Sequence, residues 1–403
     1  MKIAAIIGEF NPFHNGHRLI IEKARELGAD RVITLMSGDY VQRGVPAITD
    51  RHVRAHMALV GGADAVLSYP TRFASSTAES FAFHAVEMLN LLGCVDMLVF
   101  GSECGDLELL DRCADVLVNE SEAYKAKLKE GLRKGLSFPK ARAEALPEYA
   151  EVLSTPNNIL AVEYLKALKK IRAKMVPCTV TREGMSYLDD SKLTEMASAS
   201  ALRRALAEAD GENFPGVEIS MPEECVKILK NDVGKYGITR ANDYSLLLID
   251  RLWTVGEPFL LNKFTEMTDD LANTIIKKRN LFTTVDDFAD RCKTKNITLS
   301  HIYRAFMHVI LDFRMDPRME NPNAYYTQML GFRTESEDVV RAIQENTRIP
   351  VIMNPPREVD GLNPDQRRLF DEEMRVSNLY ESVRADKYHK PFENVFTKEL
   401  IKV

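Results

Sequence analysis

Two histidines near the start of the chain have the types and the spacing for phosphate chemistry. His14 and His17 are three residues apart, Gly16 lies between them, and an apolar run over residues 3–7 comes just before. Where a strand passes into a helix, the first helical turn offers free backbone N–H groups and the positive end of its dipole to an anion. Glycine lets the backbone approach closely, and two imidazoles one turn apart can point toward the same phosphate. We expect these donors to stabilise charge on an α-phosphate and on departing pyrophosphate.

The elements that must position this turn alternate between strand and helix patterns through the first half of the chain. Such alternation predicts a parallel sheet covered by helices on both faces, with ligands at the carboxyl ends of the strands. Gly8, Ser37 and Gly101 fall at those ends. The predicted strands span residues 2–8, 31–36, 65–68, 97–100 and 174–181, and the predicted helices span residues 18–27, 50–59, 78–92, 120–134, 156–171 and 197–209.

The character of the chain changes after a segment rich in proline and glycine at residues 210–222. We place a domain boundary there, which gives a catalytic domain over residues 1–210 and a mainly α-helical domain over residues 211–403. One short strand is expected over residues 349–353. The helical patterns of the second half span residues 225–235, 244–252, 269–278, 285–291, 300–313, 339–345 and 366–379.

Composition is ordinary for a globular protein. The 403 residues are 45% hydrophobic and 28% charged, which suits two or three domains. No apolar run approaches the ~20 residues that cross a membrane, and the N-terminus lacks a signal-peptide cleavage site. We therefore expect a cytoplasmic protein without a membrane partner. The six cysteines form no C-x-x-C pair, which argues against a zinc site, so no structural metal site is predicted.

The net charge of −6 excludes a uniformly basic coat but not a local basic patch. Residues 277–304 contain seven lysines and arginines against three aspartates, a local excess of four positive charges. Either a solvated helical face or RNA binding explains this excess. Arg43, in a glycine-flanked loop near a strand end, is a second candidate. The cationic run over residues 51–56 either faces phosphate or RNA or is a solvated helix face.

Residues 10–17, Phe-Asn-Pro-Phe-His-Asn-Gly-His, resemble the HxGH signature of the nucleotidyltransferase superfamily. Residues 197–203, Ala-Ser-Ala-Ser-Ala-Leu-Arg, are similar to its second signature, with Leu202 in place of isoleucine. A serine-rich helix start alone is more often a plain N-cap. The resemblance implies a Rossmann-like fold in which an acceptor attacks the α-phosphorus of ATP.

A closer resemblance is carried by four further motifs, at residues 38–44, 100–103, 156–160 and 181–184. With the two signatures they resemble the bacterial tRNA(Met) cytidine acetate ligase family, over most of the chain and most densely before residue 205. This chain has Asp39 and Tyr40 where Asn-Phe is expected in that family, which argues against a direct role for these two side chains. The resemblance implies that acetate is activated with ATP and that N4 of the wobble cytidine, position 34 of elongator tRNA(Met), is then acetylated.

The resemblance also implies the site residues. The catalytic pair is His14 and His17, and one asparagine of the pair at 157–158 contacts ATP. The ATP-binding set is Ile7, Gly8, Glu9, Phe10, Asn11, Pro12, Phe13, His14, Asn15, Gly16, His17, Ile20, Gly101, Asn157, Asn158, Arg182, Ser198, Ser200 and Arg203. The RNA-binding set comes from the local basic excess and the glycine-flanked loop, and the resemblance favours RNA binding over a solvated face for it: Arg43, Lys277, Lys278, Arg279, Lys293, Lys295 and Arg304.

The expected reaction has two steps. A carboxylate oxygen of acetate attacks the α-phosphorus of ATP, and pyrophosphate leaves with help from Mg²⁺ and cationic donors. The cytidine amine then attacks the carbonyl of acetyl-adenylate. Glu103 and Asp106 are candidates to hold the Mg²⁺.

Two other functions compete with this one. An adenylyl- or cytidylyltransferase of cofactor biosynthesis would act on a small phosphate ester, but the long helical second half argues against it. A tRNA-binding protein with a regulatory nucleotide site would not need both His14 and His17. Consumption of ATP with acetate, with and without tRNA, distinguishes the three functions.

Overall fold

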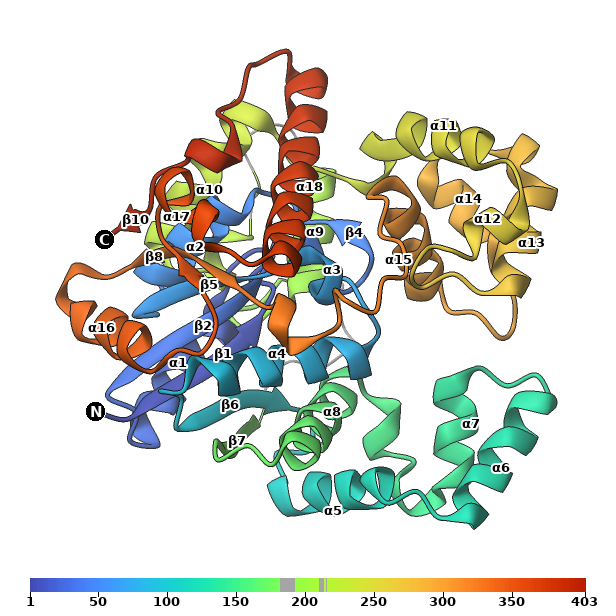
Figure 1. Cartoon of the computed structure of the whole chain (residues 1–403), viewed down its shortest axis with the longest axis horizontal. Helices are drawn as coiled ribbons and strands as arrows, with labels where there is room; N and C mark the ends of the chain where they lie inside the picture. The colour runs from blue at the N-terminus through green and yellow to red at the C-terminus, as the bar shows by residue number, and fades with distance from the viewer. Residues whose placement is uncertain (182–192, 210–213, 215) are drawn as a thin grey trace.

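The computed structural model describes residues 1–181, 193–209, 214 and 216–403. Five parallel strands form the centre of its main sheet, in the order β5-β2-β1-β6-β7 (Figure 1). This confirms the predicted α/β class and the parallel sheet. The five strands are β1 (Ile3–Gly8), β2 (Arg31–Ser37), β5 (Ala65–Tyr69), β6 (Met97–Ser102) and β7 (Val176–Thr181).

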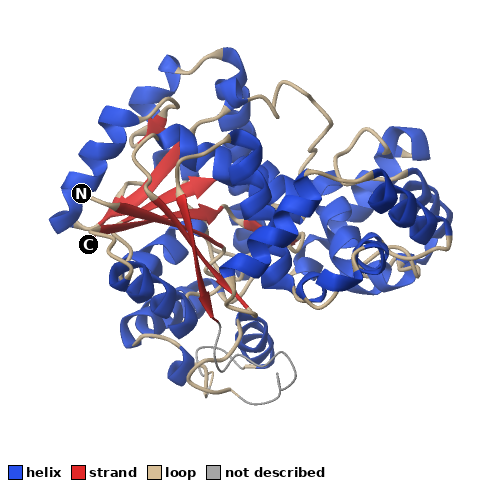
Figure 2. Cartoon of the chain, turned by 90° about the horizontal axis from the view of Figure 1, so that it is seen from below, coloured by secondary structure: helices blue, strands red, loops and turns tan. Residues whose placement is uncertain are grey.

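Helices cover both faces of the sheet, because successive side chains of a strand point to opposite faces. In β1, Ile3 and Ala5 belong to one buried apolar cluster, and Ala4 and Ile6 belong to another. Figure 2 shows the strands as one twisted layer between helices. The first cluster lies under α3 (Thr71–Ala74), α4 (Ala78–Leu92), α5 (Leu107–Val118) and α8 (Pro156–Ile171); the second lies under α1 (Asn15–Glu26), α2 (Arg51–Val60), α9 (Ala199–Glu208) and α10 (Glu223–Tyr236).

The C-terminal part of the chain returns to this sheet. Strand β8 (Thr327–Phe332) pairs antiparallel with β5, and β9 (Val351–Ile352) and β10 (Ile401–Lys402) pair with β8. The sheet therefore takes strands from both sides of residue 210, so the predicted boundary does not separate the sheet from the later helices. Residues 349–353 do contain the expected short strand. The helices of this returning part are α16 (Glu337–Asn346), α17 (Pro355–Glu358) and α18 (Pro364–Tyr388).

Two helical arms extend beyond the sheet, on the same side of the molecule (Figure 1). The smaller arm is α6 (Glu122–Arg133) with α7 (Phe138–Ala145). The larger arm has its own apolar core, with Leu248, Ile275, Phe288 and Phe306 among its buried members. Its helices are α11 (Ser245–Val255), α12 (Pro258–Leu261), α13 (Asp269–Lys278), α14 (Val285–Cys292) and α15 (Leu299–Ile310).

A buried histidine joins the larger arm to the sheet domain. His308 lies 2.9 Å through Nε2 from the carbonyl oxygen of Ser75, and its Nδ1 lies 2.6 Å from Oγ1 of Thr265. A carbonyl can only accept, so the neutral ring carries its proton on Nε2. Burial lowers the pKa of His308 to about 4, from the ordinary value of 6.5.

We predict that His308→Gln makes the stability of the protein less dependent on pH. Between pH 6.5 and 4, His308 is protonated in the unfolded chain but stays neutral in the folded wild-type protein. The free energy of unfolding of the wild type therefore falls as the pH falls. The variant lacks this contribution, which is at most about 1.4 kcal/mol per pH unit. Urea unfolding of both proteins at pH 7, 6, 5 and 4 measures the difference. Parallel pH profiles would contradict the burial of a neutral imidazole.

The sequence predicted that no segment of the chain crosses a membrane, and the hydropathy of the helices can be compared with this prediction. Across the described ranges, none of the helices combines the length and the apolar content needed to span a bilayer.

Candidate functional site

The turn between β1 and α1 is built by its two histidines. His14 is the N-cap of α1 and has an extended backbone. Its Nδ1 accepts from the backbone N–H of Gly16 at 3.0 Å, and Nδ1 of His17 accepts from the backbone N–H of His14 at 3.2 Å. This is the reciprocal arrangement of a capping box, with imidazoles in place of the usual hydroxyl and carboxylate.

The cap fixes which nitrogen of each ring can donate. Because Nδ1 accepts in both His14 and His17, the proton of the neutral ring lies on Nε2. The rings stack with centroids 3.7 Å apart and planes inclined by 29°. Both residues line the same cavity. The first turn of α1 thus adds two imidazole N–H donors to the positive end of a helix dipole.

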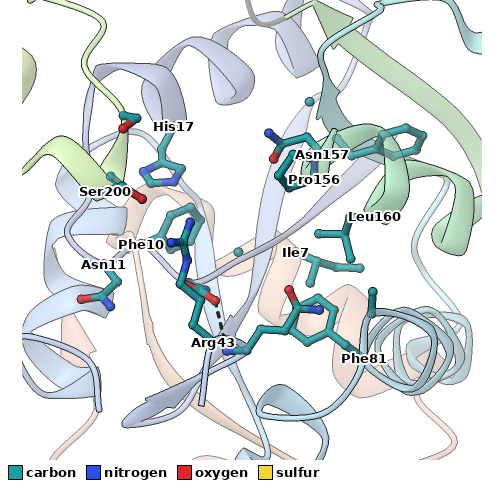
Figure 3. A pocket seen from close by; sticks show the side chains of 18 of the residues that line it. Ile7, Phe10, Asn11, His17, Arg43, Phe81, Pro156, Asn157, Leu160 and Ser200 are labelled. Carbon is teal, nitrogen blue, oxygen red and sulfur yellow. Dashed lines mark hydrogen bonds between the residues drawn. The ribbon is translucent and has the colours of Figure 1, made fainter. Parts of the chain in front are cut away.

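The cavity has a volume of about 760 Å³ and opens at the carboxyl ends of β1 and β6. His17 and Ser200 lie at one end of it, while Ile7, Leu160 and Phe81 form an apolar end (Figure 3). An anion fits the first end and an apolar group the second. From the predicted ATP-binding set, the structure brings these residues to the cavity: Ile7, Gly8, Glu9, Phe10, Asn11, His14, Gly16, His17, Ile20, Gly101, Asn157, Ser198, Ser200 and Arg203.

Other predicted ATP-binding residues lie away from the cavity. Phe13 is fully buried against Gly61, and Pro12 beside it is buried. Asn15 donates from Nδ2 to the carbonyls of Glu195 and Ile219 instead of facing the turn. None of these lines the cavity, because the turn and the first turn of α1 point successive side chains in different directions. Arg182 lies outside the described residues.

The two asparagines at the start of α8, Asn157 and Asn158, have different roles. Asn157 lines the cavity, and Figure 3 shows it beside Pro156, across from His17. Asn158 is buried, with 3% of its surface exposed, and its Oδ1 accepts from the backbone N–H groups of Glu103 and Cys104. The geometry therefore favours Asn157 as the ligand-contacting member, whereas Asn158 holds the loop after β6.

The two carboxylates considered for Mg²⁺ serve as helix caps. Glu103 accepts from both backbone N–H groups at the start of α8, at 3.1 Å from Asn157 and 2.7 Å from Asn158. Asp106 is the N-cap of α5 and accepts from the N–H of Leu109. Neither lines the cavity, and the described residues contain no group of three or more His, Cys, Asp or Glu side chains placed to hold a metal.

The serine-rich segment meets the histidine turn although it lies far along the chain. Ser198 caps α9 by accepting from the N–H of Ala201 at 3.1 Å. One turn later, Arg203 donates to the carbonyl of Asn11 at 2.8 Å and to Oγ of Ser200 at 3.3 Å. The two sequence signatures thus form one site, in which a guanidinium and two hydroxyls stand beside the imidazoles.

The two arginines of the cationic run over residues 51–56 serve neither of the roles predicted for the run. Arg54 is fully buried and donates to the carbonyls of Glu9 (2.7 Å), Ser37 (3.1 Å) and Gly38. Arg51, also buried, bonds to Glu373 at 3.1 Å. Arg54 therefore links the carboxyl ends of β1 and β2 by hydrogen bonds and stabilises the backbone at Glu9, just before the histidine turn. No sequence signal indicated this role, because the partners of Arg54 are backbone carbonyls.

Asp39 and Tyr40 of the preceding loop are also buried, and the side chain of His52 in the run is 12% exposed. Burial lowers the pKa of His52 to about 3. Asp39 accepts from the backbone N–H of Arg51 at 2.7 Å, and the hydroxyl of Tyr40 lies 3.1 Å from that of Tyr244. Both side chains are away from the cavity, in agreement with the argument against a direct role for them.

Two of the predicted RNA-binding residues line the cavity. Arg43 is exposed on the hairpin of β3 (Tyr40–Val41) and β4 (Val45–Pro46). Arg304 comes from α15 but is engaged, because its Nε lies 2.7 Å from Oε2 of Glu266. The hairpin packs closely on α15: Gly44 has a φ of +77°, and a side chain there would overlap the backbone of α15.

The other five predicted RNA-binding residues lie on the larger arm, away from the cavity. Arg279 covers the ring of Trp253 at 4.1 Å and donates to the carbonyl of Gly256 at 2.8 Å. Lys278 donates to the carbonyl of Arg291. Lys277, Lys293 and Lys295 are exposed.

Several cavity residues were missed from the sequence. The start of α15 contributes one wall, and no motif pointed to it. The apolar lining was not singled out, because apolar side chains look alike in a core and in a cavity wall. The missed residues include Gln42, Phe81, Phe100, Pro156, Leu160, Tyr164, Leu299, Ser300 and Tyr303.

Comparison with known proteins places this site in a family. The HIGH Nucleotidyl Transferase family matches residues 1–394. The tRNA(Met) cytidine acetate ligase of Clostridium perfringens strain SM101 is 36% identical over 399 residues, covering 94% of this chain and 95% of its own. That of Acetivibrio thermocellus is 32% identical, with full coverage of both chains.

Solved structures agree with these relatives. The crystal structure of Thermotoga maritima TmcAL bound with alpha-thio ATP matches the whole of both chains with a TM-score of 0.88 and 28% identity. The same protein without ligand matches with a TM-score of 0.91. Taken with the histidine turn and its serine-rich neighbour, these likenesses show that the chain belongs to the tRNA(Met) cytidine acetate ligase family of HIGH nucleotidyltransferases.

Proposed function

We propose that this protein is an ATP-dependent ligase that acetylates N4 of the wobble cytidine of elongator tRNA(Met). The observation that supports it most is the histidine cap, which puts the proton of each neutral ring on Nε2 in two residues that line one cavity together with Arg203. The relatives that match over nearly the whole chain carry the name of this activity. A tRNA substrate also fits the cytoplasm as the place of action.

The first step forms acetyl-adenylate. A carboxylate oxygen of acetate attacks the α-phosphorus of ATP, the bond to the bridging oxygen breaks, and pyrophosphate leaves. His14, His17 and Arg203 donate to the phosphate oxygens on which negative charge accumulates. The apolar end of the cavity, around Ile7 and Leu160, excludes water from the mixed anhydride.

The second step transfers the acetyl group. The N4 amine of cytidine attacks the carbonyl carbon, AMP leaves with the bonding electrons, and the amine loses one proton. No nucleophilic side chain is required, because the anhydride is already an activated acyl donor. Mg²⁺ would neutralise charge on the leaving pyrophosphate, and since Glu103 and Asp106 are engaged as caps, phosphate oxygens and water would be its main ligands.

Exchange of labelled pyrophosphate into ATP tests the first step. The proposal expects exchange that depends on acetate and needs no RNA. An enzyme of cofactor biosynthesis would instead release pyrophosphate only with another small acceptor, and a regulatory nucleotide site would hold ATP without exchange. Either of those outcomes would overturn the proposal. Loss of N4-acetylcytidine from the tRNA of a deletion strain, measured by mass spectrometry, tests the second step.

We place the RNA contacts on the larger arm and predict a separation of the two activities. Changing Lys277, Lys278, Lys293 and Lys295 to glutamate should abolish tRNA acetylation, because four attractive charges toward phosphate become repulsive. Acetate-dependent exchange should stay near the wild-type rate, since none of the four lines the cavity. Both activities are measured on the same preparations, and joint loss of the two would contradict the separation.

A further inference from the structure

The tips of the two helical arms lie next to each other. The turn between α6 and α7 contains Gly135, which has a φ of +81°, and a Cβ built there would lie 3.5 Å from Oδ1 of Asn296. Asn296 belongs to the loop that joins α14 to α15. Figure 1 shows this loop extending from the larger arm toward α7. We call residues 132–140 the first tip and residues 293–298 the second tip.

Both tips are basic and exposed. The first tip carries Arg133, Lys134 and Lys140, the second carries Lys293 and Lys295, and neither contains an aspartate or glutamate. Five positive charges therefore gather in a chain whose net charge is −6. Within the described ranges only Lys134 has an ion-pair partner, Glu130 at 2.6 Å, and both of those side chains are about two-thirds exposed. The other four cations repel one another, which opposes contact between the tips unless an anion lies between them.

The first tip also exposes large apolar side chains. Phe138 is 51% exposed and Leu132 is 42% exposed, on either side of the glycine turn. An exposed aromatic ring among lysines and arginines is typical of surfaces that bind unpaired nucleotides, because a base can stack on the ring while phosphates meet the cations.

Each tip extends from one wall of the cavity. The second tip passes directly into α15, where Leu299 and Ser300 line the cavity. The first tip leads through α7, which packs on the short helix η2 (Val152–Ser154), into α8, where Pro156 and Asn157 also line the cavity. A ligand bound across both tips would therefore contact two segments that each continue into residues lining the cavity of the histidine turn.

We propose that the two tips form one binding surface for the sugar-phosphate backbone of the tRNA substrate, with Arg133, Lys134 and Lys140 as its new half. This inference rests on the proposed function, which identifies tRNA as the ligand. It adds that the smaller arm, and not only the larger one, holds the substrate.

A charge-reversal variant with a matched control tests this. Arg133→Glu, Lys134→Glu and Lys140→Glu are combined in one protein. The control combines Lys2→Glu, Lys174→Glu and Lys402→Glu, which are exposed and lie at the opposite, amino-end edge of the parallel strands. The dissociation constant for an elongator tRNA(Met) transcript is measured at several salt concentrations, and acetate-dependent exchange is measured alongside.

The tip variant should bind the transcript at least about tenfold more weakly than the control. For the tip variant, the slope of the logarithm of the tRNA binding constant against the logarithm of the salt concentration should be shallower. The expected change is about 0.7 to 0.9 for each phosphate that the reversed side chains no longer neutralise. Its exchange rate should equal that of the control.

Equal affinities and equal salt slopes for the two variants would overturn the inference, and so would loss of exchange in the tip variant. Absence of acetate-dependent exchange in the wild type would instead overturn the proposed function, so the two failures are distinguishable.

Discussion

Replacing His14 with asparagine is expected to lower the rate of acetate-dependent pyrophosphate exchange by about 10²- to 10³-fold while α1 stays capped. Asparagine is a good N-cap, so its Oδ1 can accept from the N–H of Gly16 as Nδ1 of His14 does at 3.0 Å. What disappears is the Nε2–H donor at the cavity. The rate should fall because charge on the phosphates loses a preorganised partner in a site shielded from water.

His17→Gln likewise removes the Nε2–H donor of the second ring while keeping the helix cap. Glutamine at the third helical position completes a capping box, so the bond from the N–H of His14, 3.2 Å in the wild type, can persist. Arg18→Gln is the control, because Arg18 is exposed and, among the residues that the structure describes, forms an ion pair only with Glu22 on the same helix. Unfolding curves verify that all three variants fold. If both histidine variants exchanged pyrophosphate at the rate of the control, the histidines would be caps and nothing more.

The largest loss of stability is expected for Arg54→Met, at about 3 to 5 kcal/mol. Arg54 is fully buried and donates to the carbonyls of Glu9, Ser37 and Gly38. Without it, these carbonyls remain buried with no charged donor, and the ends of β1 and β2 lose their common anchor. Because Glu9 precedes the histidine turn, the variant should also bind ATP more weakly.

Arg18→Met is the matched control for this prediction, since it makes the same change at a side chain that is 55% exposed. Its effect on the free energy of unfolding should stay within about 0.5 kcal/mol. Urea unfolding at neutral pH compares the two variants with the wild type. A loss below about 1 kcal/mol for Arg54→Met would show that water or other donors can replace the guanidinium.

The sequence predicted the parts of the fold whose signals are local. The five parallel strands are short apolar runs that end at glycine, serine or another turn residue, and the helices between them have clear apolar spacing. The histidine turn was predictable because the strand, the glycine and the helix start all lie close together in the chain. For the same reason the helices of the larger arm agree closely with their predicted spans, and α13 matches its span fully.

Strand β8 could not be predicted in the same way. Its residues, Thr-Gln-Met-Leu-Gly-Phe, are all buried because the strand lies inside the sheet and is covered on both faces. It therefore shows no alternation of polar and apolar side chains. Its partner β5 comes far earlier in the chain, so the pairing leaves no trace in the local pattern. This return of the chain is what carries the sheet across residue 210.

In the site, sequence reasoning failed where a side chain's partners are distant. The sequence left open which of Asn157 and Asn158 contacts the ligand, because the answer depends on the distant loop after β6, whose backbone N–H groups Asn158 binds. The charge of Arg54 indicated exposure, whereas distant carbonyls determine its burial. Arg304 was counted as free for RNA, but Glu266 pairs with it from 38 residues away.

A crystal structure of this protein with a non-hydrolysable ATP analogue would show whether the histidine turn holds the phosphates of ATP. We expect phosphate oxygens about 3 Å from Nε2 of His14 and of His17, with Arg203 beside them and Asn157 across the cavity. A nucleotide bound elsewhere, with the two imidazole rings making no contact to it, would show that the histidine turn is not the phosphate site.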